Sequence, residues 1–153
     1  MRRKNNEITD RKKIDEIIKS CQVCRLAVSL NDNPYLIPVS FGYDGDNLYF
    51  HTATTGKKID YFEQNNKVCF EFDRNGRLVS GERACDWTWH YESVIGFGTI
   101  HELVKPADKE FGLNHIMQHY SGKDSWEYSE KDLERTRVWQ IRIDSITGKY
   151  LAR

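Results

Sequence analysis

Two adjacent lysines follow a glycine at a point in this sequence where positive charge is normally unfavourable. The run HTATTGKK, residues 51–58, lies between a segment with strand character and one with helical character. Because the helix macrodipole already makes the first turn positive, Lys57 and Lys58 would be stabilised there by a bound anion. Gly56 would let a phosphate approach the backbone, while amides and Thr hydroxyls donate to it. The run therefore predicts a phosphate site, and an exposed basic turn with a Thr N-cap explains it equally well.

Cysteine and histidine pairs elsewhere in the chain suggest two further chemistries. Cys21 and Cys24 form a C-x-x-C pair, but they fall where a helix ends and a strand begins, unlike a thioredoxin-type pair at a helix N-terminus. Cys69 and Cys85 are single, so no zinc site is completed and buried structural thiols are expected. The histidines at 115 and 119 lack a third ligand and the Glu of H-E-x-x-H, so no metal site is expected.

Aromatic residues alternate along one later segment. Trp87, Trp89 and Tyr91 fall on one face of a strand, where such a stripe forms a core, a dimer interface or, less often, a cofactor wall. Arg25 lies within a hydrophobic strand, where its charge needs a partner. An ion pair is the simplest expectation for it.

The elements that must position these residues are mostly strands. Residues 10–20 form an amphipathic helix with Asp10 as N-cap and isoleucines at helical spacing. Strands over 23–30, 35–43 and 47–52 follow, joined by turns at 31–34 and 44–47, and this is the pattern of an antiparallel meander.

The second half continues in the same way. A short helix over 57–65 precedes a strand over 67–73, a loop at 75–76, and one or two strands between 85 and 104. Gly96 and Gly98 in that stretch indicate a bend or a close backbone approach. A helix over 106–120 and a last strand over 138–144 complete a mainly β chain, for which an antiparallel barrel is favoured over a Rossmann sheet.

Length and charge limit the function classes. The 153 residues suffice for one domain, with residues 1–9 expected as a flexible N-terminal arm. Lys plus Arg and Asp plus Glu number 23 each, so the chain lacks the basic balance of a nucleic-acid-binding protein. It has no membrane-spanning apolar run and no signal peptide, so a cytoplasmic location with reduced cysteines is expected.

Several blocks of the sequence resemble one family. The run RLAVSLNDNPYLIPVSFGYDGDNLYFHTATTGKKIDYF is similar to the FMN-binding split barrels of the pyridoxamine 5′-phosphate oxidase superfamily. ACDWTWHYESVIGFG and VWQIRIDSITGK look like its nitroimidazole-resistance (Nim) branch, and the resemblance covers about residues 7–149. It implies a six- to seven-stranded antiparallel FMN-binding split barrel.

The resemblance also implies a set of cofactor-binding residues. A strand-ending Thr and a following basic pair grip the FMN phosphate, and the strand PVSFGY runs beneath the isoalloxazine. His51 would lie near the cofactor; the resemblance assigns no catalytic residue, and a role of His51 in proton transfer is a hypothesis that goes beyond this pattern. Such barrels are homodimers with two FMN sites at the subunit interface, so residues 87–93 line the site from the partner chain. The residues implied in these roles are Val39, Ser40, Phe41, His51, Thr52, Gly56, Lys57, Lys58 and Trp87.

Two departures bear on activity. The C-terminal Arg and His motif that holds the substrate of true pyridoxamine phosphate oxidases is absent, and Ile37 replaces an FMN-contacting arginine. Oxidation of pyridoxamine phosphate is therefore not expected, and the resemblance to the Nim branch implies reduction of a small electrophile such as a nitroaromatic instead. The alternatives are a non-catalytic flavin carrier or sensor, and a haem-binding split barrel with an axial ligand at His51, His90 or His101.

Overall fold

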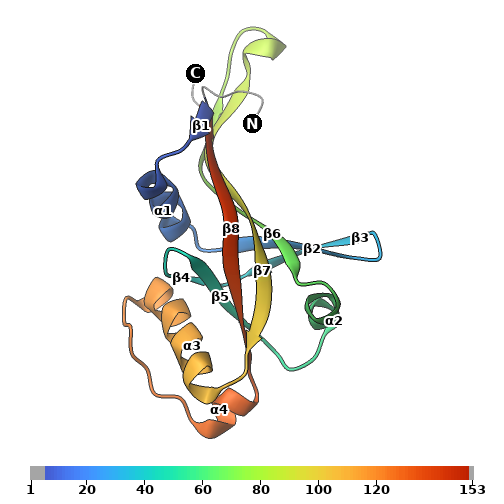
Figure 1. Cartoon of the computed structure of the whole chain (residues 1–153). Coiled ribbons are helices and arrows are strands. Elements are labelled where there is room, and N and C mark those ends of the chain that lie inside the picture. The colour runs from blue at the N-terminus through green and yellow to red at the C-terminus, as the bar shows by residue number, and fades with distance from the viewer. Residues whose placement is uncertain (1–5, 152–153) are drawn as a thin grey trace.

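Eight antiparallel strands form one coiled sheet in the computed structural model of this protein, in which we describe residues 6–151 (Figure 1). The strand order is β3-β2-β6-β7-β8-β5-β4, with β1 paired to β8. The elements are β1 (Glu7–Ile8), α1 (Arg11–Ser20), β2 (Cys24–Leu30), β3 (Asn33–Val39), β4 (Gly42–Tyr43), β5 (Asn47–Thr52), α2 (Lys57–Gln64), β6 (Lys67–Val79), the 3₁₀ helix η2 (Ala84–Asp86), β7 (Thr88–Leu103), α3 (Pro106–Ser121), α4 (Glu130–Glu134) and β8 (Arg137–Leu151).

The predicted fold class is confirmed, and the strands differ from the prediction in number and length. The segment expected as one strand over 35–43 is divided into β3 and β4, and Glu7–Ile8 adds a short strand opposite Gly148 and Lys149. Residues 1–5 of the expected N-terminal arm lie outside the described residues. β8 has 15 residues and is about twice as long as the strand predicted over 138–144.

β6 is also continuous where a loop was expected. It passes through residues 75 and 76 with a register shift between Arg74 and Arg77. Asn75 takes a left-handed conformation, with φ of 58°. This conformation occurs in β-bulges as well as in turns, so the turn-like residues here are compatible with a bulge. Beyond Tyr91, which pairs with Leu151, the β6–β7 hairpin continues alone as an arm that projects from the body (Figure 1).

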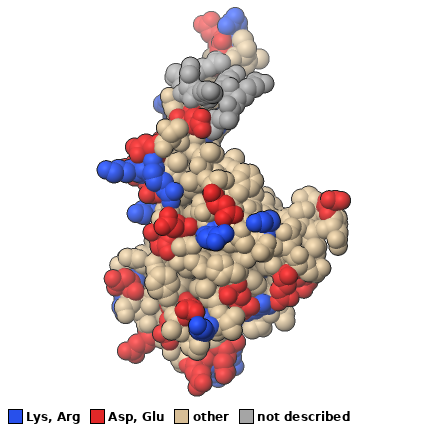
Figure 2. Space-filling view, in the orientation of Figure 1, with Lys and Arg blue, Asp and Glu red and all other residues tan. Residues whose placement is uncertain are grey.

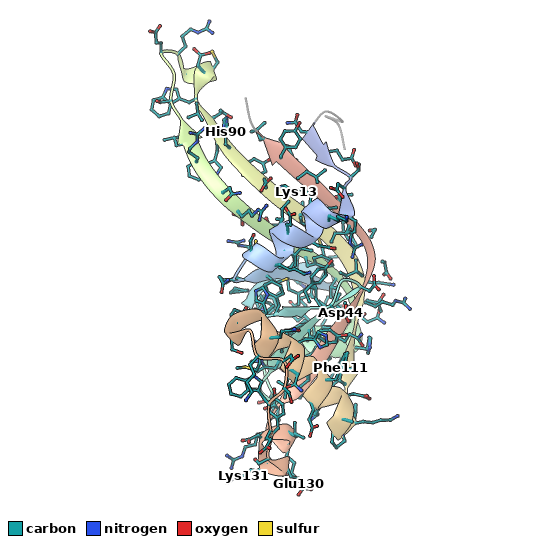
Figure 3. The ribbon with its side chains drawn as sticks, turned by 90° about the vertical axis from the view of Figure 1, so that its left-hand side faces the viewer. Lys13, Asp44, His90, Phe111, Glu130 and Lys131 are labelled. Carbon is teal, nitrogen blue, oxygen red and sulfur yellow. The ribbon has the colours of Figure 1, made fainter. Side chains whose placement is uncertain are left out.

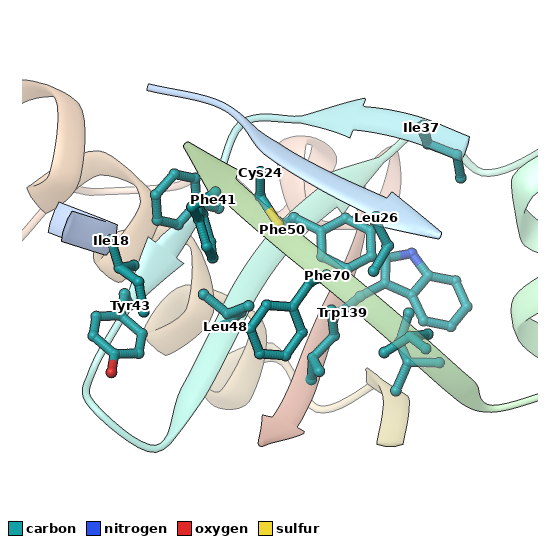
Figure 4. Packing of buried hydrophobic residues seen from close by; sticks show 14 of the residues in the cluster. Ile18, Cys24, Leu26, Ile37, Phe41, Tyr43, Leu48, Phe50, Phe70 and Trp139 are labelled. Atoms are coloured by element: carbon teal, nitrogen blue, oxygen red, sulfur yellow. The ribbon is translucent and has the colours of Figure 1, made fainter. Parts of the chain in front are cut away.

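The sheet coils around a core without closing, because β3 and β4 are its two ends. Pro34 and Pro38 in β3 have no N–H, so the free edge of that strand offers few donors for an additional strand. Aromatic side chains fill the interior, among them Phe50, Phe70 and Trp139, each at most 3% exposed (Figure 4).

Helices cover the sheet as their sequence patterns predict. In α1 the side chain of Asp10 accepts from the Lys12 amide at 3.0 Å, and the three isoleucines of the helix are buried. α3 packs against β4, β5 and β8. It approaches so closely that a Cβ on Gly42 would lie 2.4 Å from the carbonyl carbon of His115.

The glycines in β7 mark close contacts, as predicted. A Cβ on Gly96 would lie 2.1 Å from the ring of Phe70, and one on Gly98 would lie 2.5 Å from the backbone oxygen of Arg142. Only glycine therefore fits at these two positions of the unshifted core.

The surface shows basic and acidic side chains interspersed on the face seen in Figure 2. Among the described residues, no helix is both long and apolar enough to cross a membrane.

Candidate functional site

The N-terminus of α2 is an open turn centred on Gly56. Gly56 is the N-cap, with φ of 140°, and a Cβ there would meet nothing within 4 Å. It provides no side-chain cap, and the first turn is closed by the Ile59 amide donating to the Gly56 carbonyl at 2.9 Å. Ile59 and Phe62 of the same helix are buried and fix it on the sheet. The turn thus presents uncapped amides to an accessible space, which suits an anion.

Lys57 and Lys58 extend from this turn toward two different strands. The Lys57 ammonium lies 4.8 Å from the centroid of Tyr35 in β3 and 5.8 Å from that of Tyr61. Lys58 is half-buried and close enough to His51 in β5 for its charge to act on the imidazole. The two lysines of the first turn therefore differ in their surroundings, since Lys57 lies over aromatic rings and the charge of Lys58 acts on His51.

His51 lies near the end of β5, with part of its side chain exposed to solvent and part of its ring buried. Partial burial of the ring, together with the charge of Lys58, lowers the pKa of His51 below its usual value. The imidazole is therefore neutral at neutral pH and can accept a proton.

The hydroxyl of Thr52, which we expected to grip the FMN phosphate, is engaged within the protein. It is 5% exposed, its Oγ1 donates to the carbonyl of Ala53 at 2.8 Å, and it accepts from Trp139 Nε1 at 3.0 Å. Because its one hydroxyl hydrogen is already donated, Thr52 fixes the start of the loop. Thr54 and Thr55, which are exposed, carry the hydroxyls that can face an anion.

Sequence reasoning missed a cation that braces this region. Arg137 pairs with Glu63 of α2 at 2.8 Å and with Glu102 of β7 at 2.9 Å, and its guanidinium lies 4.7 Å from the centroid of Trp139. Arg137 thereby ties α2 to the sheet. The missing signal was the register of β5 with β8, which places Thr52 opposite Arg137.

The segment expected beneath the isoalloxazine divides into accessible and buried parts. Val39 is half-buried and Ser40 is exposed. Phe41 is 1% exposed and lies between Phe72 and His119, with ring centroids at 4.9 and 4.4 Å. The side chain of Phe41 is therefore part of the core, and only the side chains of Val39 and Ser40 are accessible to a ligand in this segment.

Trp87 lies at the end of the β6–β7 arm, next to η2, and is 51% exposed. The arm extends away from α2 (Figure 1), so a single chain does not bring Trp87 to the lysines. His90 is also in the arm, far from Asp44 and Phe111 near the body of the protein (Figure 3).

The three histidines considered as haem ligands are not brought together. His51 and His90 lie at separate places in β5 and in the arm. His101 Nε2 lies 2.8 Å from Gln140 Oε1, while Gln140 donates to Tyr49, whose hydroxyl donates to Asp44. Since that chain of hydrogen bonds ends on a carboxylate, Gln140 presents its oxygen to His101, and His101 donates through Nε2, so this nitrogen is already engaged.

The cysteines are free thiols without the features of a redox pair. Burial raises the pKa of Cys21 and of Cys24, and Cys21 Sγ donates to the carbonyl of Asp73 at 3.4 Å. Arg25 pairs with Glu71 at 3.2 Å, as expected. Within residues 6–151, no group of three or more His, Cys, Asp or Glu side chains is placed to hold a metal ion.

A second feature missed from the sequence is an open groove of about 530 Å³ between α3 and the sheet. Tyr49, His101, Phe111 and Gln140 are among its lining residues. These residues come from four elements, so no local pattern could have indicated the groove.

Comparison with known proteins agrees with this fold. The sequence profile described as pyridoxamine 5′-phosphate oxidase matches residues 10–150. An uncharacterised protein of Rhizobium meliloti is 27% identical over 124 residues, which are 81% of this chain and 69% of the relative.

Two solved structures are similar over nearly the whole chain. A protein of Bacteroides thetaiotaomicron whose suggested role is 5-nitroimidazole antibiotic resistance is 33% identical, with a TM-score of 0.84 over 94% of this chain and 86% of that one. An FAD- and haem-binding protein of Mycobacterium smegmatis is 18% identical, with a TM-score of 0.86 over 97% and 74%. At that identity the second structure supports the fold alone.

Proposed function

The chain belongs to the pyridoxamine 5′-phosphate oxidase family, and on this premise we propose that it is an FMN-dependent oxidoreductase. The observation that carries the proposal is the open N-terminus of α2, where Gly56 leaves the amides without a side-chain cap and two lysines follow it in the first turn. A phosphate at this turn would be held by amides, by Lys57 and Lys58, and by the exposed hydroxyls of Thr54 and Thr55.

The flavin ring would lie farther along β3. From Tyr35, beside Lys57, to Ser40 the extended chain spans about 17 Å, at 3.4 Å for each residue. Val39 and Ser40 would then face the ring, with the phosphate at the other end of the cofactor. FMN, when bound, would supply the electron-transfer chemistry, and the protein would bind and orient it.

We further propose a homodimer, because one face of the sheet carries uncovered apolar residues. Leu36, Ala27, Cys69 and Phe97 are directly opposite one another across β3, β2, β6 and β7. Leu36 is 62% exposed and Phe97 56%, and Ile95 on the same face is 44% exposed. A contiguous apolar row of this kind on a sheet suits burial against a second copy.

The arm supports the same assembly. Leu78, Trp87 and Trp89 are each more than half exposed on a two-stranded ribbon that has little core of its own. In a homodimer the arm would pack on the partner, and Trp87 would line the FMN site of the other subunit. This accounts for the distance between Trp87 and the lysines within one chain.

The acceptor we propose is a small electrophile such as a nitroaromatic. The relative with a suggested role in 5-nitroimidazole resistance supports this class at 33% identity. His51, neutral beside Lys58, is the candidate for relaying a proton, which it would take up from solvent on one ring nitrogen and pass to the acceptor from the other. A flavin carrier or sensor would share the same binding residues and differ only in lacking turnover.

Visible absorption of the purified protein, before and after addition of FMN and desalting, tests the cofactor. We expect a retained flavin band in the wild type and its loss in the Lys57→Ala, Lys58→Ala double variant. Riboflavin, which lacks the phosphate, should bind both proteins equally. Retention of FMN by the double variant would remove the lysines from the site, and a Soret band would replace flavin by haem. Reoxidation of the reduced flavin by a nitroaromatic distinguishes an enzyme from a carrier.

A further inference from the structure

The C-terminal turn of α3 is joined to the segment that follows β3 by a hydrogen-bonded tyrosine. The hydroxyl of Tyr120 accepts from the backbone amide of Phe41 at 3.1 Å and donates to the carbonyl of Gln22 at 2.8 Å. The amide and the hydroxyl belong to residues 79 positions apart in the chain. One hydroxyl thus connects α3, the end of β3 and the segment before β2.

A second residue of the same turn contacts the same place. His119 lies with its ring centroid 4.4 Å from that of Phe41, and its Nε2 donates to the carbonyl of Cys21 at 2.8 Å. The ring of Tyr120 packs edge-on against His119 at 4.8 Å. Phe41 is therefore held at its side chain by His119 and at its amide by Tyr120.

The residue after Phe41, Gly42, is in close backbone contact with the same helix. Gly42 lies so close to the backbone of α3 that no Cβ would fit there. The side chain of Phe41, its amide and the backbone of Gly42 therefore all contact α3. These contacts anchor the segment after Val39 to that helix.

From these contacts we propose that Tyr120 is a positioning residue, which fixes Val39 and Ser40 against the flavin ring through the amide of Phe41. The inference rests on the proposed function, because it requires the ring to lie along this segment. Tyr120 does not touch the cofactor in this scheme. Its role is to keep the accessible pair of residues in one place relative to the phosphate turn at Gly56.

The Tyr120→Phe variant tests the role, since phenylalanine keeps the ring and removes both hydrogen bonds. Tyr128→Phe is the matched control, because the Tyr128 hydroxyl donates to Asn114 at 3.0 Å and has no contact with Phe41. Dissociation constants for FMN and for riboflavin are measured for both variants and the wild type, together with the flavin absorption band and the melting temperature.

We expect Tyr120→Phe to raise both dissociation constants about tenfold, because Val39 and Ser40 would no longer be fixed before the flavin binds, and to change the shape of the bound-flavin band. Tyr128→Phe should leave both constants unchanged. An effect on FMN alone would place the action of Tyr120 at the phosphate end and overturn the proposal, as would unchanged constants or an equal effect in the control. If the wild type retains neither flavin, the proposed function itself fails and the positioning role with it.

Discussion

Replacing Lys58 by glutamine should change two measurable properties, because Lys58 belongs to the first turn of α2, where we propose that the phosphate binds, and because its charge acts on His51. Lys58 is half-buried, so a hydrogen bond from it to a phosphate would be only partly screened by water. A hydrogen bond to a charged group contributes about 1.5–3 kcal/mol. Its loss should raise the dissociation constant of FMN about ten- to a hundredfold.

The second property is the titration of His51. Its pKa is lowered in the folded protein by partial burial and by Lys58, so Lys58→Gln should raise it. Because the unfolded chain binds a proton at His51 near pH 6.5 and the folded protein does so only at lower pH, stability falls as pH decreases below about 6.5. The variant should lessen this fall.

Lys57→Gln is the control, since its ammonium lies over Tyr35 and Tyr61 and its charge is not among those that act on His51. Isothermal titration with FMN and NMR titration of the His51 ring resolve the two effects. We expect both lysine variants to weaken FMN binding and only Lys58→Gln to raise the pKa of His51. A Lys58→Gln protein with wild-type FMN affinity and a raised His51 pKa would show that the lysine faces the histidine without serving a phosphate.

Two further predictions concern the core and the apolar sheet face. Gly96→Ala should destabilise the protein by about 1–3 kcal/mol, because the new methyl group would overlap the ring of Phe70, and Phe70→Leu in the same chain should recover part of that loss in a double-mutant cycle by urea unfolding. Additive effects would contradict the close contact. Phe97→Asp should shift the proposed dimer toward monomer in analytical ultracentrifugation. Val104→Asp is the control, because Val104 is 73% exposed and lies outside the apolar row of Leu36, Ala27, Cys69 and Phe97. Equal behaviour of the two variants would exclude this face as the interface.

The parts of the fold that could be predicted are those decided by local patterns. The isoleucines of α1 and the alternation of Val68, Phe70 and Phe72 each place one face of an element in the core, and all of these residues are buried. Gly96 was interpretable for the same reason, since a glycine in an otherwise apolar strand needs a neighbour that fills its space.

The parts that could not be predicted depend on pairing between distant segments. The end of β8 has no clear alternation and is a strand because β7 and β1 pair with it. Asn75 and Gly76 are turn residues by composition, and they form a bulge because β7 continues opposite them. At the site, Thr52 was expected to face a phosphate, and only the register with β8 reveals that Trp139 and Ala53 use its hydroxyl.

This last difference bears on the choice between a phosphate site and an ordinary basic turn. The ordinary turn required a Thr as N-cap of α2, which would satisfy the first amides without a ligand. In the structure the N-cap is Gly56, which has no side chain to offer, and the nearest buried threonine is engaged with the sheet. Asp60 in the first turn offsets part of the lysine charge. Its ionised carboxylate cannot donate a hydrogen bond to a phosphate, and no side chain caps the amides of this turn. The amides therefore have water or an anion as their remaining partners, and the two lysines of this turn favour the anion.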